Sequence, residues 1–207
     1  MKSSFLILIV LLLAMLSCST SGQPDVTETP EMNVSSDKIL IVYLSRTKNT
    51  KAVAEMIQQK VGGRLVALEL QNSYPADYSA TVDQVARENA SGFLPPLASR
   101  IESIEKYDMI FLGFPTWGMQ LPPPIKSFLA QYNLSGKTIA PFNTNAGYGI
   151  GTSFDQVKSL ARGSNVLQGL TTKGGIERDG VLFVMQGDKL VQVESEVARW
   201  LQSLKLP

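Results

Sequence analysis

The chain contains no histidine and a single cysteine, Cys18, among its 207 residues. These two absences exclude intramolecular disulfides, zinc sites built from several cysteines, and catalytic triads that depend on histidine. A large excess of positive or negative charge is also lacking, because 19 basic and 18 acidic residues leave a formal net charge of +1. No surface for nucleic acid is therefore expected, and the chemistry must come from something other than histidine and cysteine side chains.

Long apolar runs are scarce as well, and the one that exists lies at the start of the chain. Lys2 precedes an uninterrupted apolar run at residues 5–16, and the small residues Ser17, Cys18 and Ser19 follow it. This is the layout of a secretory signal. A bilayer span needs about 20 apolar residues, more than this run offers. We predict a signal peptide over residues 1–17.

The position of Cys18 resembles that in a bacterial lipoprotein signal, in which this cysteine becomes the lipid-bearing first residue. Met15-Leu16-Ser17 departs from the usual pattern of Leu, a small residue, then Gly, Ala or Ser. An ordinary cleaved signal and an uncleaved anchor remain alternatives. Residues 19–37 are rich in Ser, Thr, Pro and acidic residues and indicate a flexible tether. We therefore expect an exported domain held by lipid at Cys18 on the periplasmic or cell-surface side of a bacterial membrane.

From residue 38 onward, short apolar segments alternate with amphipathic ones. The pattern predicts one domain over residues 38–207, with strands at 38–44, 64–70, 109–114, 137–143 and 166–171 and helices at 49–61, 78–90, 123–132, 154–161 and 190–204. Such alternation is typical of an α/β fold, a doubly wound five-stranded parallel sheet with helices on both faces. Residues 181–185 do not fit this count and leave open an extra hairpin near 176–187.

The segment after the first predicted strand, Ser45-Arg46-Thr47-Lys48-Asn49-Thr50, is crowded with hydrogen-bond donors. It leads directly into a helix, and the N-terminus of a helix exposes unpaired N–H groups that favour phosphate. A plain helix cap would explain one Ser, Thr or Asn here, but four polar donors occupy these six positions. We interpret the segment as a phosphate site.

Two further loops follow the third and fourth predicted strands. Trp117 stands in one of them, where it either packs into the core or stacks on a flat ring. The other, residues 144–151, contains three glycines and Tyr148. It is either a plain flexible loop or a place where backbone approaches a ligand closely. Loops after the carboxyl ends of parallel strands converge, so the three together indicate a mononucleotide with a planar ring.

These residues resemble the flavodoxin family, which binds FMN in this arrangement. Residues 45–50 are similar to its phosphate loop, (S/T)-x-T-G-x-T. Residues 74–78 (YPADY), 107–117 and 135–142 resemble a branch of short flavodoxin-like proteins that are sometimes lipoproteins. The resemblance implies strand order 2-1-3-4-5 and FMN as cofactor. It implies FMN contacts from Ser45, Arg46, Thr47, Lys48, Asn49, Thr50, Pro115, Thr116, Trp117, Gly118, Thr144, Asn145, Ala146, Gly147, Tyr148 and Gly149.

The chain departs from the family pattern at three places. Lys48 replaces the usual glycine of the phosphate loop, so it is strained if the backbone needs a positive φ and otherwise adds a phosphate contact. The branch often has two tryptophans after the third strand, whereas here only Trp117 is present, followed by Gly118. Asn143, Asn145 and Ala146 stand where Cys and His or Ser are frequent.

Three functions are compatible with these features. The first is a one-electron carrier that exchanges electrons with a redox partner protein, favoured by the short chain and the lack of a nicotinamide-binding motif. The second is an FMN-dependent reductase that takes hydride from NAD(P)H and reduces a quinone, for which a homodimer would be common. The third is a binding module without redox activity. No catalytic side chain is expected in the first two, since the flavin ring carries the chemistry.

Overall fold

Short apolar segments form a central parallel sheet in the computed structural model, which describes residues 34–206. The strands are β1 (Ile39–Tyr43), β2 (Arg64–Ala67), β3 (Met109–Pro115), β4 (Thr138–Asn145), β5 (Asn165–Val166) and β6 (Leu170–Lys173). Their order is β2-β1-β3-β4-β5, with β6 also paired to β4, and every pairing is parallel. The predicted α/β fold and strand order are confirmed. The predicted signal peptide, Cys18 and most of the tether lie outside the described residues.

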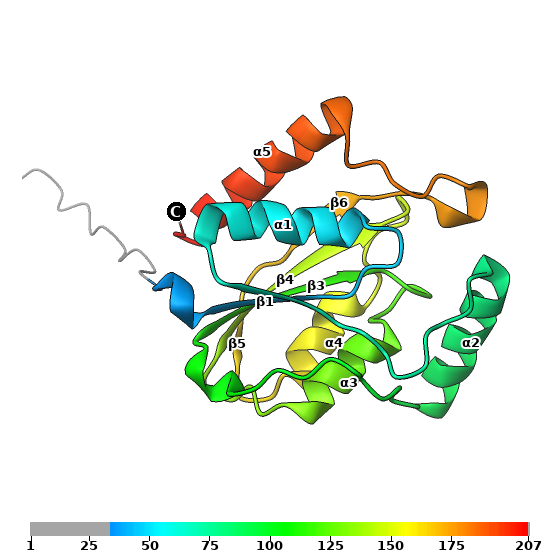
Figure 1. Ribbon diagram of the computed structural model, residues 1–207, viewed down its shortest axis with the longest axis horizontal. Coiled ribbons are helices and arrows are strands. Elements are labelled where there is room, and N and C mark those ends of the chain that lie inside the picture. Colours follow the sequence, from blue (N-terminus) through cyan, green and yellow to red (C-terminus); the bar gives the residue numbers. More distant parts are fainter. Residues whose placement is uncertain (1–33, 207) are drawn as a thin grey trace, which may run out of the picture. The chain divides into compact units, whose positions relative to one another are not determined.

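Helices cover both faces of the sheet (Figure 1). Alternate residues of the strands point to opposite faces, so Ile39 and Ile41 pack with α1 (Asn49–Val61) and α5 (Gly187–Ser203). Leu40 and Val42 pack on the other side with α3 (Pro123–Gln131) and α4 (Ser153–Leu160). All five residues of β1 are buried, as expected for a strand that is covered on both faces.

Helix α2 (Tyr78–Ser91) is the exception to this layering. It stands beyond the carboxyl ends of the strands instead of covering a face of the sheet (Figure 1). Asp77 caps its N-terminus by accepting from the Ala80 N–H at 2.7 Å, and Gly92 ends it with φ +70°. The expectation of helices on both faces therefore holds for the other four helices, and α2 is free to contribute to a site at this end.

The fifth predicted strand, residues 166–171, is split into β5 and β6, both beside β4. Pro141 of β4 lies opposite the break and has no N–H to donate. Ile139 and Asn145 both accept hydrogen bonds from the β5–β6 side. Successive residues of a strand direct their backbone N–H and C=O groups to alternate sides. The backbone nitrogen of Pro141 therefore also faces the β5–β6 side. A Cβ on Gly169 would come within 2.8 Å of the Pro141 carbonyl oxygen, so the chain passes closely there.

The hairpin left open near residues 176–187 is reduced to one antiparallel bridge between Ile176 and Val181. A short 3-10 turn, Glu177–Asp179, joins the two residues. The Gly175 backbone lies so close that a Cβ there would sit 2.3 Å from the Val181 carbonyl oxygen. The segment from 174 to 186 is thus a folded loop at the same end of the sheet as α2.

Helix α1 begins after a residue in the left-handed region, Lys48, with φ +66°. This is the position at which the flavodoxin pattern has glycine. A left-handed conformation brings the Cβ of an L residue too close to the following carbonyl, so Lys48 is strained there. Within residues 34–206, no helix has both the length and the apolar character needed to cross a bilayer.

We expect Lys48→Gly to stabilise the fold. Relief of the left-handed strain, about 1–2 kcal/mol, exceeds the backbone entropy that glycine loses on folding, about 0.5–1 kcal/mol. Urea unfolding should show a gain of up to about 1 kcal/mol. The matched control is Lys51→Gly inside α1, where the same replacement should cost about 1 kcal/mol. A loss of stability in Lys48→Gly would contradict the strain.

Candidate functional site

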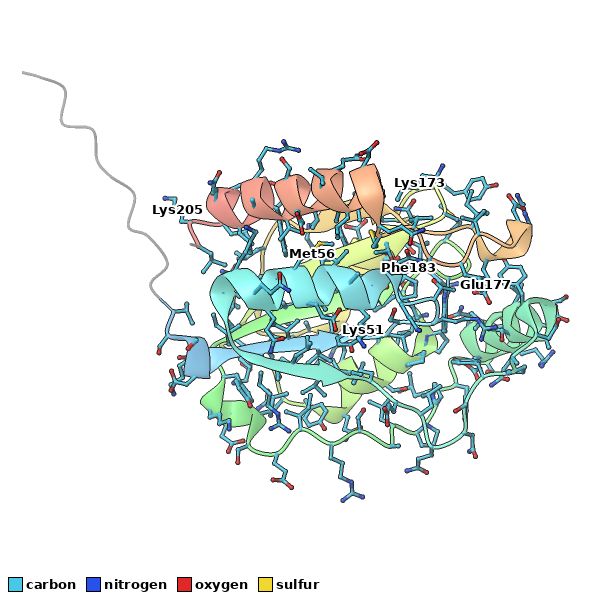
Figure 2. All side chains as sticks on the ribbon, turned by 45° about the horizontal axis from the view of Figure 1, so that its top comes forward. Lys51, Met56, Lys173, Glu177, Phe183 and Lys205 are labelled. Carbon is cyan, nitrogen blue, oxygen red and sulfur yellow. The ribbon has the colours of Figure 1, made fainter. Side chains whose placement is uncertain are left out.

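A cavity of about 540 Å³ opens at the carboxyl end of the sheet. Its lining comes from the loops after β1, β3 and β4, from α2, and from the loop after β6. Ligand pockets in proteins usually range from about 300 to 1,000 Å³. Figure 2 shows Glu177 and Phe183 of the loop after β6 at this end of the molecule, opposite Lys205 near the C-terminus.

The loop between β1 and α1 leaves a row of backbone donors free. Among the described residues, none accepts a hydrogen bond from the N–H groups of residues 46–50. The next N–H, that of Lys51, is capped by the Ser45 hydroxyl at 3.2 Å. Arg46, Thr47, Asn49 and Thr50 line the cavity. Unpaired N–H groups and the positive end of the helix dipole together favour an anion.

The side chain of Asn49 fixes this loop through hydrogen bonds to Thr47 and to the loop after β6. Its buried amide donates to the Leu182 carbonyl at 2.6 Å and accepts from the Val184 N–H at 3.1 Å. The same amide donates to the Thr47 hydroxyl at 2.9 Å. Thr47 can therefore direct its own hydroxyl proton elsewhere, and the loop after β6 is fastened to the start of α1.

Arg46 ties three segments together. Its guanidinium pairs with Glu177 at 2.7 Å and donates to the carbonyls of Pro75 and Ala76 at 2.9 and 2.8 Å. The resemblance implied that this cationic side chain contacts FMN. Its charge is instead balanced by Glu177, which also lines the cavity, so these two side chains add no net charge to the lining.

Trp117 forms part of another wall of the cavity and is half-buried. Tyr74 contacts it edge-on, with ring centroids 5.2 Å apart and planes at 88°. The Tyr74 hydroxyl donates to Glu88 of α2. Burial, together with this carboxylate, raises the pKa of Tyr74 well above its usual value. Trp117 and Gln120 exchange backbone hydrogen bonds around Gly118 and Met119, both with φ +58°, so a tight turn orients the indole.

The glycine loop after β4 is shaped by asparagines. Asn145 accepts from the N–H groups of Gly147 and Gly149 at 2.8 and 3.2 Å. Buried Asn143 donates to the Phe114 carbonyl at 3.1 Å. Asn145 thus fixes the backbone of the glycine loop, and Asn143 ties the end of β4 to β3. Thr144, Asn145 and Ala146 line the cavity.

Five of the expected site residues do not line the cavity: Ser45, Lys48, Gly147, Tyr148 and Gly149. Ser45 acts as a cap for α1, and Lys48 is exposed. The resemblance implied an FMN contact from Tyr148, but this side chain is 64% exposed and its hydroxyl accepts from Arg178 at 3.2 Å. The structure thus places this aromatic outside the cavity.

Eleven lining residues were missed: Tyr78, Thr81, Val82, Val85, Ala86, Asn89 and Ala90 of α2, Gln120, and Gly174, Gly175 and Glu177. The α2 residues recur three and four positions apart, which is one face of a helix. We call this face the α2 wall. The spacing was visible in the sequence, but it indicated only a face to be buried, not that a cavity lies opposite it.

The family model for flavodoxin matches residues 38–185. A protein assigned as a flavoprotein from Bacteroides eggerthii DSM 20697 is 28% identical, with a TM-score of 0.66, over 82% of this chain and 99% of that one. A second from Bacteroides uniformis ATCC 8492 is 24% identical, with a TM-score of 0.65 and coverage of 81% and 99%, and it supports the fold alone.

A flavoprotein from Lactobacillus acidophilus NCFM, solved in complex with FMN, is 27% identical. It has a TM-score of 0.59 and covers 65% of this chain and 93% of its own. No curated protein matches the chain. The family match spans more than half of the sequence and agrees with the strand order, so this chain belongs to the flavodoxin family.

Proposed function

We propose that this protein binds FMN at the carboxyl end of its sheet and transfers electrons while tethered to a membrane by lipid at Cys18. The observation that carries the proposal is the loop at one side of the cavity in which the N–H groups of residues 46–50 have no acceptor within residues 34–206, with Trp117 in the lining as well. The first feature suits a phosphate and the second a flat ring. The FMN complex of the similar Lactobacillus protein supports the same ligand.

The residues present fit this cofactor. Gly174 packs where a Cβ would meet Asn49 and Thr144 at 3.3 and 3.4 Å, so the backbone lies close to the phosphate loop. The hydroxyls of Thr50 and Thr144 bond each other at 2.8 Å and join the two loops. Bound FMN supplies electron and hydride transfer. The protein would hold the phosphate, cover one side of the ring and limit access of water.

Transfer of single electrons to and from a redox partner protein is the function we favour. Lys2 is the only charged residue that removal of residues 1–17 takes away, so the mature chain has no formal net charge. Recognition of the partner would therefore not depend on strong charge steering. A second candidate is an FMN-dependent NAD(P)H:quinone reductase, an activity for which two subunits often pair to build the substrate pocket. The α2 wall favours it, because it extends the cavity with Val82, Val85 and Ala86, which suit an apolar substrate.

FMN should bind to protein lacking residues 1–18 at least about 100-fold more tightly than riboflavin, because hydrogen bonds to a charged group are worth about 1.5–3 kcal/mol each. Quenching of flavin fluorescence measures both affinities. Thr47→Val should narrow the ratio about tenfold by removing one hydroxyl donor, with riboflavin binding unchanged. Equal affinities for the two flavins would overturn the phosphate site, and binding of neither would favour a module without redox activity.

Trp117→Ala should weaken binding of both FMN and riboflavin by about tenfold, because an aromatic contact is worth about 0.5–1.5 kcal/mol beyond the buried area. Trp117→Phe, which keeps an aromatic face, should retain most of the affinity. The other tryptophan, Trp200, packs edge-on to Phe111 on the opposite side of the sheet from α3, so Trp200→Phe is a matched control. Unchanged affinity in Trp117→Ala would place the ring elsewhere.

The lipid tether is tested with the full-length chain and Cys18→Ser in a bacterial host, by partition between detergent and aqueous phases. The wild-type protein should enter the detergent phase, and Cys18→Ser should lose the lipid and show an altered mass. If both variants enter the detergent phase equally, the apolar run is an uncleaved anchor. If both stay in the aqueous phase, the run is an ordinary cleaved signal.

A further inference from the structure

Lys126 of α3 lies behind the cavity wall and contacts two residues of the lining. Its ammonium donates to the side-chain oxygens of Asn89 and Gln120 at 2.8 and 2.9 Å. In the described part of the chain no carboxylate forms an ion pair with it. Burial lowers the pKa of this lysine. A partly desolvated cation that bonds only neutral oxygens favours negative charge or electron-rich atoms nearby.

The contacts with Lys126 determine how the two amides are oriented. An ammonium can only donate, so the group that faces it in each amide must be the oxygen. The NH₂ groups of Asn89 and Gln120 therefore occupy the other branch of each amide. Neither nitrogen donates to any residue between 34 and 206. Both residues line the cavity, so two NH₂ donors remain for a ligand there.

Apolar and aromatic groups adjoin these donors. Asn89 belongs to the α2 wall together with Val82, Val85 and Ala86, and the tight turn after β3 joins Gln120 to Trp117. The cavity thus combines flat or apolar surface with a pair of oriented donors. A planar ring that carries a carbonyl oxygen matches this combination, because the ring packs on the apolar surface and the oxygen accepts from the amides.

We propose that Asn89 and Gln120 form a donor pair that binds the carbonyl oxygen of a planar ring, with Lys126 as the positioning residue. This inference rests on the proposed function, because the ring is either the flavin itself or a quinone that is reduced by it. Both carry ring carbonyls, and their binding can be measured separately. The donor pair would thereby determine which ring system the cavity accepts.

Asn89→Asp and Gln120→Glu test the donor pair with little change of shape. Each carboxylate still accepts from Lys126, so thermal unfolding should not show a loss of stability, but each replaces an NH₂ donor by an acceptor. The matched control is Asn133→Asp. Exposed Asn133 accepts from the Ser135 N–H at 3.1 Å, and the change adds the same charge away from the cavity lining. Lys126→Met frees both amides to rotate and should therefore weaken binding of the ring. Lys126→Arg, which keeps the charge, should restore much of the affinity that Lys126→Met loses.

Two affinities are measured for each variant: riboflavin with apo-protein, and 2-methyl-1,4-naphthoquinone with FMN-loaded protein. If the donor pair binds the flavin, Asn89→Asp and Gln120→Glu should weaken riboflavin binding at least about tenfold, as for an unmade buried hydrogen bond. If the donor pair binds the quinone, only naphthoquinone binding should weaken to that extent. In either case Asn133→Asp should match the wild type.

Asn89→Asp and Gln120→Glu are each compared with the wild type in both assays. If both variants bind riboflavin and naphthoquinone as tightly as the wild type does, the donor pair is overturned and the proposed function is left intact. If wild-type protein binds neither FMN nor riboflavin, the proposed function fails, and the naphthoquinone titration is then made on apo-protein. Binding there that is lost in Asn89→Asp would support the donor pair independently of FMN. No binding of naphthoquinone by that apo-protein would overturn it.

Discussion

The first turn of α1 depends on a single buried side chain, Asn49. Its amide bonds the backbone of Leu182 and Val184 and the hydroxyl of Thr47. A buried amide that loses such partners costs about 1–3 kcal/mol, so the three contacts hold loop and helix in one arrangement. In that arrangement no residue between 34 and 206 accepts a hydrogen bond from the N–H groups of residues 46–50, and a phosphate site at this position requires these groups free.

The other loops are arranged around this turn by polar contacts of the same kind. Arg46 joins it through Glu177 to the loop after β6, and Thr50 joins it through Thr144 to β4. Asn145 then fixes the glycine loop, and Thr116 bonds the Gly149 carbonyl at 3.1 Å. Loops are usually the more mobile parts of a fold. Here side-chain hydrogen bonds tie each loop to another, which suits a preformed ligand site.

The departures from the flavodoxin pattern have different physical effects on the site. Lys48 occupies a left-handed position and is exposed, so it adds strain without contributing to the cavity lining. Asn145 stabilises the glycine loop, and Asn143 joins β4 to β3. Tyr148, from which the resemblance implied an FMN contact, lies outside the cavity, and α2 supplies a wall that the sequence analysis did not predict. The site therefore differs from the expected one most strongly on the α2 side.

The sequence by itself determined the alternating elements, the strand order through the family resemblance, and the bounds of α1 at residues 49 and 61. It also placed the three loops at one edge, because apolar periodicity and the rules of parallel sheets are local or topological. Only the tertiary structure decided the α2 wall, the Arg46–Glu177 pair and the orientation of the amides at Lys126. The Arg46–Glu177 contact joins residues 131 positions apart. Periodicity shows that a helix has a face to bury, but not what lies opposite that face, and no local pattern encodes which distant side chains meet.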